Sequence, residues 1–311
     1  APTGTLSGVA NGGVTNGSVY FTWVENNATA TLDGAPYTKR TTISAEGLHT
    51  IVLTDAAGNS TTYTFTIDKN APKPIFSVNP SNTVSGTYYF NRALSISWKK
   101  DGVTATIDGN TYNAGDVISD EGTYTLILTD AAGNSTTYTF VIDKTAPTGE
   151  VKLNERTAFQ KFINTITFGL FFKDDVHVKL TATDEASGVK SVLYFKSDRI
   201  LTDEEVRAIT DWTDNSDFDI EAKDMDKFVI YVRIEDNAGN VTLIGSDGAT
   251  FDTTAPEIVG VENDKTYYVT KKVAIDDENL ASVTLNGETV EDVFTLVGDK
   301  DATYVIRTED K

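Results

Sequence analysis

The sequence predicts an all-β protein built of tandem β-sandwich domains in an extended array. The twelve-residue segment TDAAGNSTTYTF occupies residues 54–65 and recurs 75 positions later, at residues 129–140. A diverged third copy of its central motif, EDNAGN, lies at residues 235–240. Thr, Val, Ile, Tyr, Gly and Asn are abundant, which is typical of short strands joined by tight turns. A repeat at this spacing indicates separate domains that follow one another along the chain.

A linker motif with the pattern D-x-x-A-P sets the expected domain boundaries. It follows the three repeat copies as DKNAP, DKTAP and DTTAP. The motif divides the chain into four expected domains, at residues 1–72, 73–147, 148–256 and 257–311. Because Asp310 aligns with the hairpin aspartates of the other copies, we expect the fourth domain to be truncated before its last strand. The strand at residues 304–308 would then have an unpaired edge.

Alternation of polar and apolar residues predicts the strands of the first domain, and the repeat carries them into the second. The expected strands are residues 18–23, 28–32, 48–54 and 61–67. Asp33-Gly34 and the equivalent Asp108-Gly109 supply the positive φ values that a tight hairpin requires. Trp23 and Trp98 occupy equivalent positions on an early strand, where we expect both indoles in the core between two sheets.

The third domain is longer and contains a short inserted helix, predicted near residues 202–210. Thr202 and Glu205 form a T-x-x-E capping box ahead of the apolar residues Val206 and Ile209. We expect this helix to cover an edge or an end of the sandwich. Further strands are expected in the third and fourth domains at residues 179–183, 189–195, 228–234, 271–275, 282–285 and 303–308.

The DxAGN hairpin, the strand that follows it and the [IF]-D-x-x-A-P linker resemble bacterial immunoglobulin-like (Ig-like) domains, which occur in tandem in large cell-surface proteins and adhesins. The segments SGVKSVLYF and LTDEEV resemble a longer variety of these domains. The resemblance implies Ig-like β-sandwiches in an extracellular location, at a bacterial cell surface or secreted. It does not decide the function, because such modules serve as stalks, as adhesive tips and as accessory domains of secreted glycosidases.

The charge of the chain excludes several classes of partner. The 46 acidic and 26 basic side chains give a formal net charge of −20, and such a surface repels nucleic acid. No apolar run approaches the ~20 residues of a membrane span, so we expect no membrane insertion. The chain has no cysteine, so these domains fold without disulfides.

The sequence offers little chemistry for catalysis. His49 and His177 are its only histidines, and His49 aligns with Tyr124 of the second repeat, which indicates a packing role. No G-x-S-x-G, phosphate-loop or zinc-binding spacing is present, so a pair of carboxylates remains the one catalytic option. We predict no catalytic residue, no cofactor-binding residue and no enzymatic activity.

Six aspartates recur near the expected domain joints and are candidate ligands for calcium, which takes six to eight oxygens. In some Ig-like adhesins that this chain resembles, calcium stiffens such joints. The candidates are Asp55, Asp130 and Asp236 at the hairpins, and Asp68, Asp143 and Asp252 at the linkers. The alternative, which we favour, is that each hairpin aspartate caps its own turn while Asn59, Asn134 and Asn240 adopt the left-handed conformation.

Aromatic side chains are candidates for glycan binding, because sugar rings stack on exposed aromatic faces. Trp212, which follows the predicted helix, is the best single candidate for a ligand-binding residue. Six aspartates lie between Asp211 and Asp226, but this stretch lacks the glycine at the bend that a calcium loop needs. We therefore expect a solvated loop there.

Together these features favour a monomeric, non-enzymatic spacer or adhesion fragment of a bacterial surface protein. Its strand lengths and short linkers predict a semi-rigid segment on the order of 100 Å or more. Its partner would be a host surface protein or a glycan. The alternative is a set of accessory, glycan-binding Ig-like domains beside a secreted carbohydrate-active enzyme.

Overall fold

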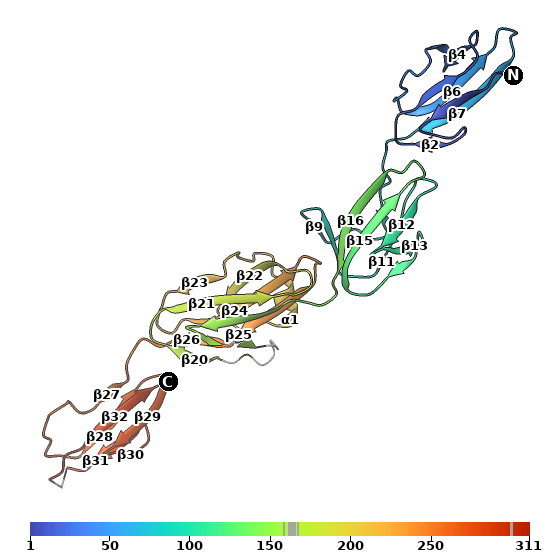
Figure 1. Ribbon diagram of the computed structural model, residues 1–311. Helices are drawn as coiled ribbons and strands as arrows, with labels where there is room; N and C mark the ends of the chain where they lie inside the picture. Colours follow the sequence, from blue (N-terminus) through green and yellow to red (C-terminus); the bar gives the residue numbers. More distant parts are fainter. Residues whose placement is uncertain (158, 161–165, 167, 299–300) are drawn as a thin grey trace. The chain divides into compact units, whose positions relative to one another are not determined.

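The computed structural model describes residues 1–157, 159–160, 166, 168–298 and 301–311. These residues form two compact units. The first unit holds residues 1–145 with 185–187 and 237–240, and the second holds residues 146–184, 188–236 and 241–311. The described secondary structure is β-strand apart from one short helix (Figure 1).

The first unit begins with a sandwich of two sheets around one core. Its strands are β1 (Gly4–Ser7), β2 (Val14–Thr15), β3 (Tyr20–Trp23), β4 (Thr29–Leu32), β5 (Ala35–Tyr37), β6 (Gly47–Thr54) and β7 (Ser60–Ile67). One sheet pairs β1 with β3, and the other has the order β2-β7-β6-β4-β5. The inward-facing residues Phe21, Ile51, Leu53 and Phe65 are almost fully buried, as the alternating pattern predicts.

A second sandwich in the same unit repeats this pattern with matching register. Its strands are β8 (Ile75–Phe76), β9 (Asn82–Val84), β10 (Thr87–Phe90), β11 (Leu94–Ser97), β12 (Thr104–Ile107), β13 (Asn110–Tyr112), β14 (Val117–Ile118), β15 (Gly122–Thr129) and β16 (Ser135–Ile142). Gly47 pairs with Ile67 across β6 and β7, and Gly122 pairs with Ile142 across β15 and β16. The sequence repeat is therefore a repeat of strand pairing.

The turns confirm the glycine prediction and correct the asparagine one. Asp33 and Gly34 have φ values of 50° and 86°, and the equivalent Asp108 and Gly109 have 49° and 81°. In the AAGN hairpins the positive φ belongs to the glycines, Gly58, Gly133 and Gly239, and not to the asparagines that follow them. Glycine carries no Cβ, so it takes this conformation at lower cost than asparagine.

The two tryptophans are less buried than expected. Trp23 and Trp98 pack against the two cores but are only partly buried. The fully buried positions are Phe21 and Ile96, two residues earlier on the same strand face. Trp23 lies at the end of β3, where the ammonium of Lys39 approaches its ring at 5.4 Å.

The second unit contains a larger sandwich whose core is the most extensive of the described chain. Its strands are β17 (Thr148–Leu153), β18 (Arg156–Thr157), β19 (Phe159–Gln160), β20 (Phe168–Phe172), β21 (Val176–Thr183), β22 (Val189–Ser197), β23 (Asp217–Ile220), β24 (Lys227–Asp236), β25 (Val241–Ser246) and β26 (Gly248–Phe251). One sheet has the order β18-β17-β21-β23; in the other, β24 pairs with β22, β25 and β26. Five consecutive residues of β24, from Phe228 to Val232, are fully buried, because one face lies on the main core and the other lies under the helix region.

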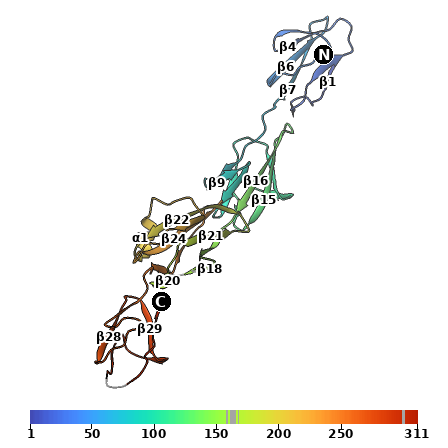
Figure 2. The same ribbon diagram turned by 90° about the vertical axis from the view of Figure 1, so that its left-hand side faces the viewer.

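The predicted helix is present as α1 (Asp203–Ala208), and its capping box is confirmed. The Thr202 side chain accepts a hydrogen bond from the Glu205 backbone N–H, and the Glu205 side chain accepts one from the Thr202 N–H. Val206 is fully buried against Val229 and Tyr231 of β24. In both views of the chain α1 lies beside this sheet (Figures 1 and 2). It covers the face of β24 that points away from the main core, and not an edge or an end of the sandwich as expected, because its apolar residue packs onto a central strand.

The last sandwich, also in the second unit, is small. Its strands are β27 (Glu257–Val259), β28 (Lys271–Asp276), β29 (Leu280–Leu285), β30 (Glu288–Thr289), β31 (Val293–Leu296) and β32 (Ile306–Asp310). The final strand begins at Ile306, later than expected, because Val305 instead exchanges hydrogen bonds with the turn residue Asn286. Among the described residues β32 pairs only with β29 and is the edge of its sheet.

A parallel strand pair recurs in the first three sandwiches. The early strands β2, β10 and β20 pair in parallel with the late strands β7, β16 and β26. Separate apolar clusters lie between the sheets of each sandwich. The predicted fold class, tandem Ig-like β-sandwiches with a short inserted helix, is confirmed.

Candidate functional site

The hairpin aspartates Asp55 and Asp130 cap their own turns through side-chain hydrogen bonds. Asp130 Oδ1 accepts hydrogen bonds from the backbone N–H groups of Ala132 (3.0 Å) and Asn134 (2.8 Å). Asp55 makes the equivalent bonds to Ala57 and Asn59, both at 2.9 Å. The structure therefore contains the turn-capping geometry that we favoured for these residues.

The hairpin and linker aspartates of one repeat copy lie at opposite ends of a strand. The eight residues of β7 separate Asp55 from Asp68, and the eight of β16 separate Asp130 from Asp143. At ~3.3 Å per residue each strand spans about 26 Å, so these pairs cannot share an ion. Within each unit, a linker aspartate instead meets the hairpin aspartate of the next copy.

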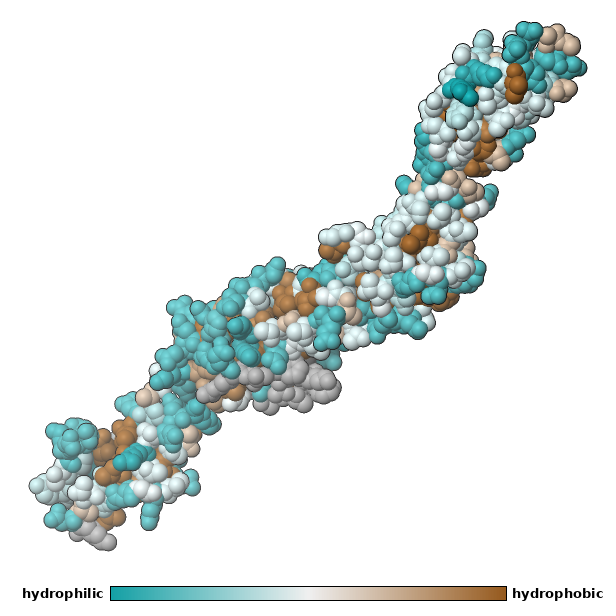
Figure 3. Space-filling model, viewed as in Figure 1, coloured by the Kyte–Doolittle hydropathy of each residue, from teal (hydrophilic) through white to brown (hydrophobic). Residues whose placement is uncertain are grey.

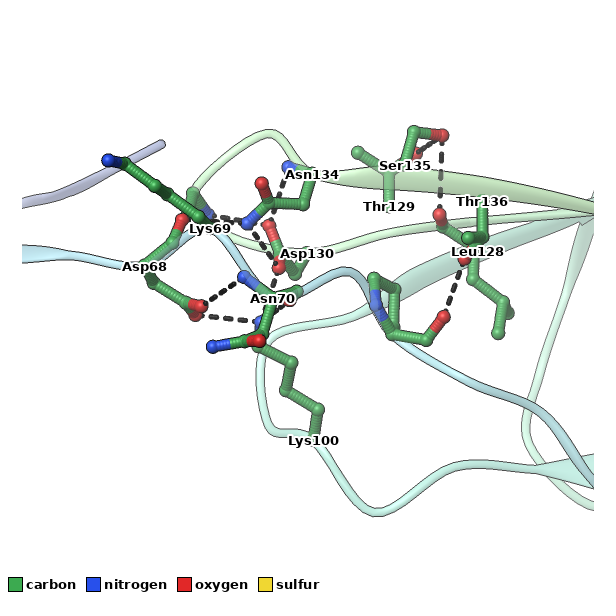
Figure 4. Close-up of polar contacts among 12 residues, drawn as sticks. Asp68, Lys69, Asn70, Lys100, Leu128, Thr129, Asp130, Asn134, Ser135 and Thr136 are labelled. Carbon is green, nitrogen blue, oxygen red and sulfur yellow. Dashed lines mark hydrogen bonds and ion pairs between the residues drawn. The ribbon is translucent and has the colours of Figure 1, made fainter. Parts of the chain in front are cut away.

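Asp68 and Asp130 form such a pair, with a lysine between them (Figure 4). Lys100 Nζ lies 2.7 Å from Asp68 Oδ2 and 2.5 Å from Asp130 Oδ2. The same ammonium donates a hydrogen bond to the carbonyl of Asn70. The Asp130 side chain is 1% exposed, and those of Lys100 and Asp68 are 29% and 24% exposed. A protein ammonium thus occupies the space between two carboxylates that we had proposed as calcium ligands.

The surroundings of Asp130 favour its charged form. Burial opposes ionisation, but the hydrogen bonds from Lys100 and Asn134 outweigh it and lower the pKa of Asp130 to about 2. The pKa of Lys100 is raised, because hydrogen bonds to Asp130 and Asp68 outweigh the effect of burial. Both groups are therefore charged at neutral pH.

The linkers are bonded to the sandwich that follows them. In the first unit Asn134 Nδ2 donates to the carbonyl of Asp68 (2.8 Å), and Asn240 Nδ2 donates to that of Asp143 (2.9 Å). A threonine hydroxyl also donates to each linker proline carbonyl. These pairs are Thr61 with Pro2 (2.6 Å), Thr136 with Pro72 (2.5 Å) and Thr242 with Pro147 (2.5 Å).

Asp143 and Asp236 belong to different compact units. Asp143 is fully buried in the first unit, where its two side-chain oxygens accept from the N–H groups of Thr145 (3.0 Å) and Ser187 (3.1 Å). Asp236 is fully buried at the end of β24 in the second unit.

Asp252 lies in the second unit in a group of three carboxylates with Asp277 and Asp310. One oxygen from each lies within 4.8 Å of the others. Asp252 is 8% exposed, and its Oδ2 and the Oδ1 of Asp310 are buried without a hydrogen-bond partner. No described lysine, arginine or histidine forms a salt bridge with any of the three. Burial and the neighbouring charges of Asp252 and Asp277 raise the pKa of Asp310.

This group combines one predicted residue with two that the sequence analysis missed. Asp310 aligns with the hairpin aspartates but is not among the six candidate ligands, and Asp277 lies outside every repeated motif. Asp277 directly follows β28, the strand that pairs with the residues after the linker. Comparing that position between copies would have found it.

His49 occupies a packing position, as its alignment with Tyr124 indicated. Its ring lies 5.3 Å from that of Phe65, with Nε2 2.9 Å from the Ala45 carbonyl and Nδ1 2.7 Å from Asp33 Oδ2. Tyr124 stacks on the equivalent Phe140, and its hydroxyl donates to the Asp120 carbonyl. Although burial opposes protonation, the bonds to Ala45 and Asp33 raise the pKa of His49.

The second histidine, His177, lies at the surface of the larger sandwich. Its ring nitrogens approach Asp219 at 2.8 Å and Asp217 at 3.3 Å. These hydrogen-bonded and charged neighbours raise its pKa. His177 lies opposite Asp219 on β21 and β23, so the two side chains form a cross-strand ion pair. Residues 217–220, which we expected in a solvated loop, therefore form a strand of the sandwich.

Trp212 lies next to the helix and packs against the apolar cluster beneath it. The indole N–H donates to the carbonyl of Ile209 (2.9 Å), and the ring is partly buried against residues that include Leu201, Val206 and Tyr231. The polar atom that would contact a ligand is thus already used within the protein.

The surface shows no large apolar area on the face drawn in Figure 3. Hydrophobic residues form small patches separated by hydrophilic and neutral ones. In the part of the chain that the structure describes, no helix has the length and apolar character needed to span a membrane.

Comparison with known proteins gives similarity in structure alone. No family model matches the chain, and no curated protein is significantly similar to it. Three domains of the bacteriophage RB49 highly immunogenic outer capsid protein align at 10% identity with a TM-score of 0.36, over 82% of this chain and all of that one. Fibronectin(III)-like modules of Clostridium thermocellum CbhA align at 10% identity and 0.29, over 58% of this chain and 94% of that one. Consecutive titin domains align at 11% identity and 0.28, over 81% and 98%.

Proposed function

We propose that this chain is a non-enzymatic, extracellular spacer and adhesion segment of a bacterial surface protein. The observation that carries the proposal is the repeated bonding of linker to sandwich. Three linker prolines accept a hydrogen bond from a threonine of the strand that follows a DxAGN-type hairpin. A flexible tether needs no such contacts, whereas a spacer that must hold its modules at a set distance does.

The surface is acidic, and its hydrophobic and hydrophilic residues are interspersed on the face drawn in Figure 3, which supports the same role. A net charge of −20 keeps long molecules apart from one another and from anionic surfaces. The described histidines make packing and cross-strand contacts. The chemistry of the chain therefore favours mechanical separation and presentation over turnover.

Small-angle scattering of the whole chain tests the spacer. We expect a maximum dimension on the order of 100 Å or more, and a broader distance distribution when Thr136 and Thr242 are both changed to Val. An unchanged distribution in the double variant, with intact secondary structure, would contradict the proposed role of the linker bonds. Screening the chain against arrays of host proteins and glycans then separates a plain spacer from an adhesive segment.

The alternative role, accessory glycan-binding domains of a secreted carbohydrate-active enzyme, makes a different prediction. The chain would bind an insoluble polysaccharide, and Trp212→Ala would abolish retention while Trp98→Ala, in a different sandwich, would not. Failure to bind any polysaccharide excludes this alternative.

A further inference from the structure

In every copy, the first strand after the linker pairs with a later strand of the same sandwich, and one position just after this later strand differs in charge between copies. In the last sandwich Glu257, which follows linker residue Pro256, pairs with Asp276, and Asp277 comes next. In the second sandwich Ile75 pairs with Ser97. Continuing that antiparallel register pairs Lys73, which follows Pro72, with Lys99, and Lys100 comes next. Lys100 and Asp277 are therefore structurally equivalent.

Extending the strand register in the same way places an acidic residue at this position in the other copies. Gly4 pairs with Trp23 in the first sandwich, which places Glu25 at this position. Thr148 pairs with Thr183 in the larger sandwich, which places Asp184 there. The second copy is thus the exception, with a base where the others carry an acid.

This difference in charge changes the surroundings of the linker and hairpin aspartates. Where the position is Lys100, the ammonium lies between the linker and hairpin aspartates and satisfies both. Where it is Asp277, a third carboxylate joins Asp252 and Asp310, and two buried oxygens have no hydrogen-bond donor. Burying unpaired carboxylates is costly, so a bound cation would stabilise such a group.

We infer that this single position decides how two pairs of linker and hairpin aspartates are neutralised: Lys100 supplies a tethered ammonium to Asp68 and Asp130, and Asp277 completes a calcium site with Asp252 and Asp310. The geometry fits one ion. Calcium binds oxygen at about 2.3–2.6 Å, so ligands on opposite sides of the ion are about 4.6–5.2 Å apart. The three carboxylate oxygens lie within 4.8 Å of one another. Carbonyl oxygens and water complete the six to eight ligands that calcium takes.

Calcium fits this group better than magnesium. Magnesium demands near-ideal octahedral geometry at about 2.0–2.1 Å and keeps several of its waters. The three aspartates come from the end of β26, the end of β28 and the end of β32, so their carboxylates can adjust to a larger and more flexible coordination shell.

The inference is tested in the whole chain by substituting lysine for Asp277 and aspartate for Lys100. Hydrogen exchange is measured by mass spectrometry with chelator, with 1 mM CaCl2 and with 1 mM MgCl2. In the unchanged protein, calcium should slow exchange at least tenfold in peptides covering β28 and β32, and should leave β11 and β15 unaffected. Magnesium should have a much smaller effect, and an equal effect would overturn the choice of calcium.

Asp277→Lys should slow exchange in β28 and β32 without calcium and remove the calcium response, because the new ammonium replaces the ion. The matched control is Asp276→Lys, which makes the same charge change at the exposed neighbouring residue and should keep the response. Lys100→Asp should make β11 and β15 calcium-dependent, whereas Lys99→Asp should not. The inference is overturned if calcium fails to protect β28 and β32 in the unchanged protein, or if the Asp277 and Asp276 variants behave alike.

Discussion

Removing the Lys100 ammonium should destabilise the second sandwich selectively. The variant Lys100→Met keeps most of the apolar length of the side chain and deletes the charge between Asp68 and Asp130. Asp130, with a side chain that is 1% exposed, would retain its turn bonds to Ala132 and Asn134 but lose its charge partner. Breaking a fully buried ion pair by removing one member costs about 3–5 kcal/mol.

The expected loss here is smaller, because water reaches part of the ion pair. Lys100 and Asp68 are 29% and 24% exposed, so solvent screens part of the interaction. We expect about 2 kcal/mol, which corresponds to roughly 30-fold faster exchange of amides that open with this sandwich. The affected peptides should be those of β15 and β16, while β6 and β7 of the first sandwich exchange as before.

Lys99→Met is the matched control for this experiment. Lys99 is adjacent, equally charged and exposed, so its loss should change exchange in β15 and β16 less than twofold. Equal exchange rates for the Lys100 and Lys99 variants would refute the assignment of stability to the ion pair. The outcome does not depend on whether calcium binds elsewhere in the chain.

Three further predictions test other parts of the structure. The pKa of Asp130 is lowered in the folded protein to about 2, below its ordinary value of 3.8. The charged carboxylate should therefore contribute its full stability above about pH 4, and this contribution should disappear as the pH falls through about 2. In a pH series of unfolding midpoints, an Asp130→Asn variant that lost the same stability at pH 2 as at pH 7 would contradict this. His49→Tyr, which installs the residue of the second repeat, should keep the bond to the Ala45 carbonyl and the contact with Phe65. The pKa of His49 is raised in the folded protein, so the histidine contributes stability below about pH 6.5 that is lost as the pH rises through its folded pKa. In chemical denaturation the stability of the unchanged protein relative to His49→Tyr should therefore fall between pH 5 and pH 8, and a difference that is constant over this range would contradict the role of the protonated ring. Gly149→Ala should lower the free energy of unfolding by about 1–3 kcal/mol, because the added Cβ would lie 2.3 Å from Ile234 Cδ1 and 2.7 Å from the Thr181 carbonyl oxygen. Gly17→Ala is the control, since its nearest contact would be at 3.6 Å. Equal thermal unfolding of the two variants would show that the larger sandwich relaxes around the methyl group.

The sequence by itself determined the class of fold and most of the strands. A period of two residues in the apolar pattern fixes which side chains point inward, and this is a local property of the chain. The hairpin turns at Asp33-Gly34 and Asp108-Gly109 were predictable for the same reason, since only residues that tolerate positive φ fit there. The helix was equally local, because Thr202 and Glu205 cap it from within one turn.

Predictions failed where the outcome depended on contacts beyond the local pattern. Trp23 is the last residue of β3 and Trp98 directly follows β11, and the alternating pattern does not predict where a strand ends. The last strand begins late because Val305 bonds to Asn286, 19 residues away in the sequence. No sequence motif marks these strand boundaries.

The candidate site was decided by the tertiary structure. The repeat identified the aspartates but not which of them meet, because an eight-residue strand holds the hairpin and linker residues of one copy apart. Folding instead brings Asp68 to Asp130 of the next copy, and Lys100, 32 positions from Asp68, lies between them. In the second unit it assembles Asp252, Asp277 and Asp310 from three strand ends. Charges so far apart in the sequence become neighbours only through sheet register and linker contacts, so the sequence specified the acidic residues and the fold decided which of them lie together.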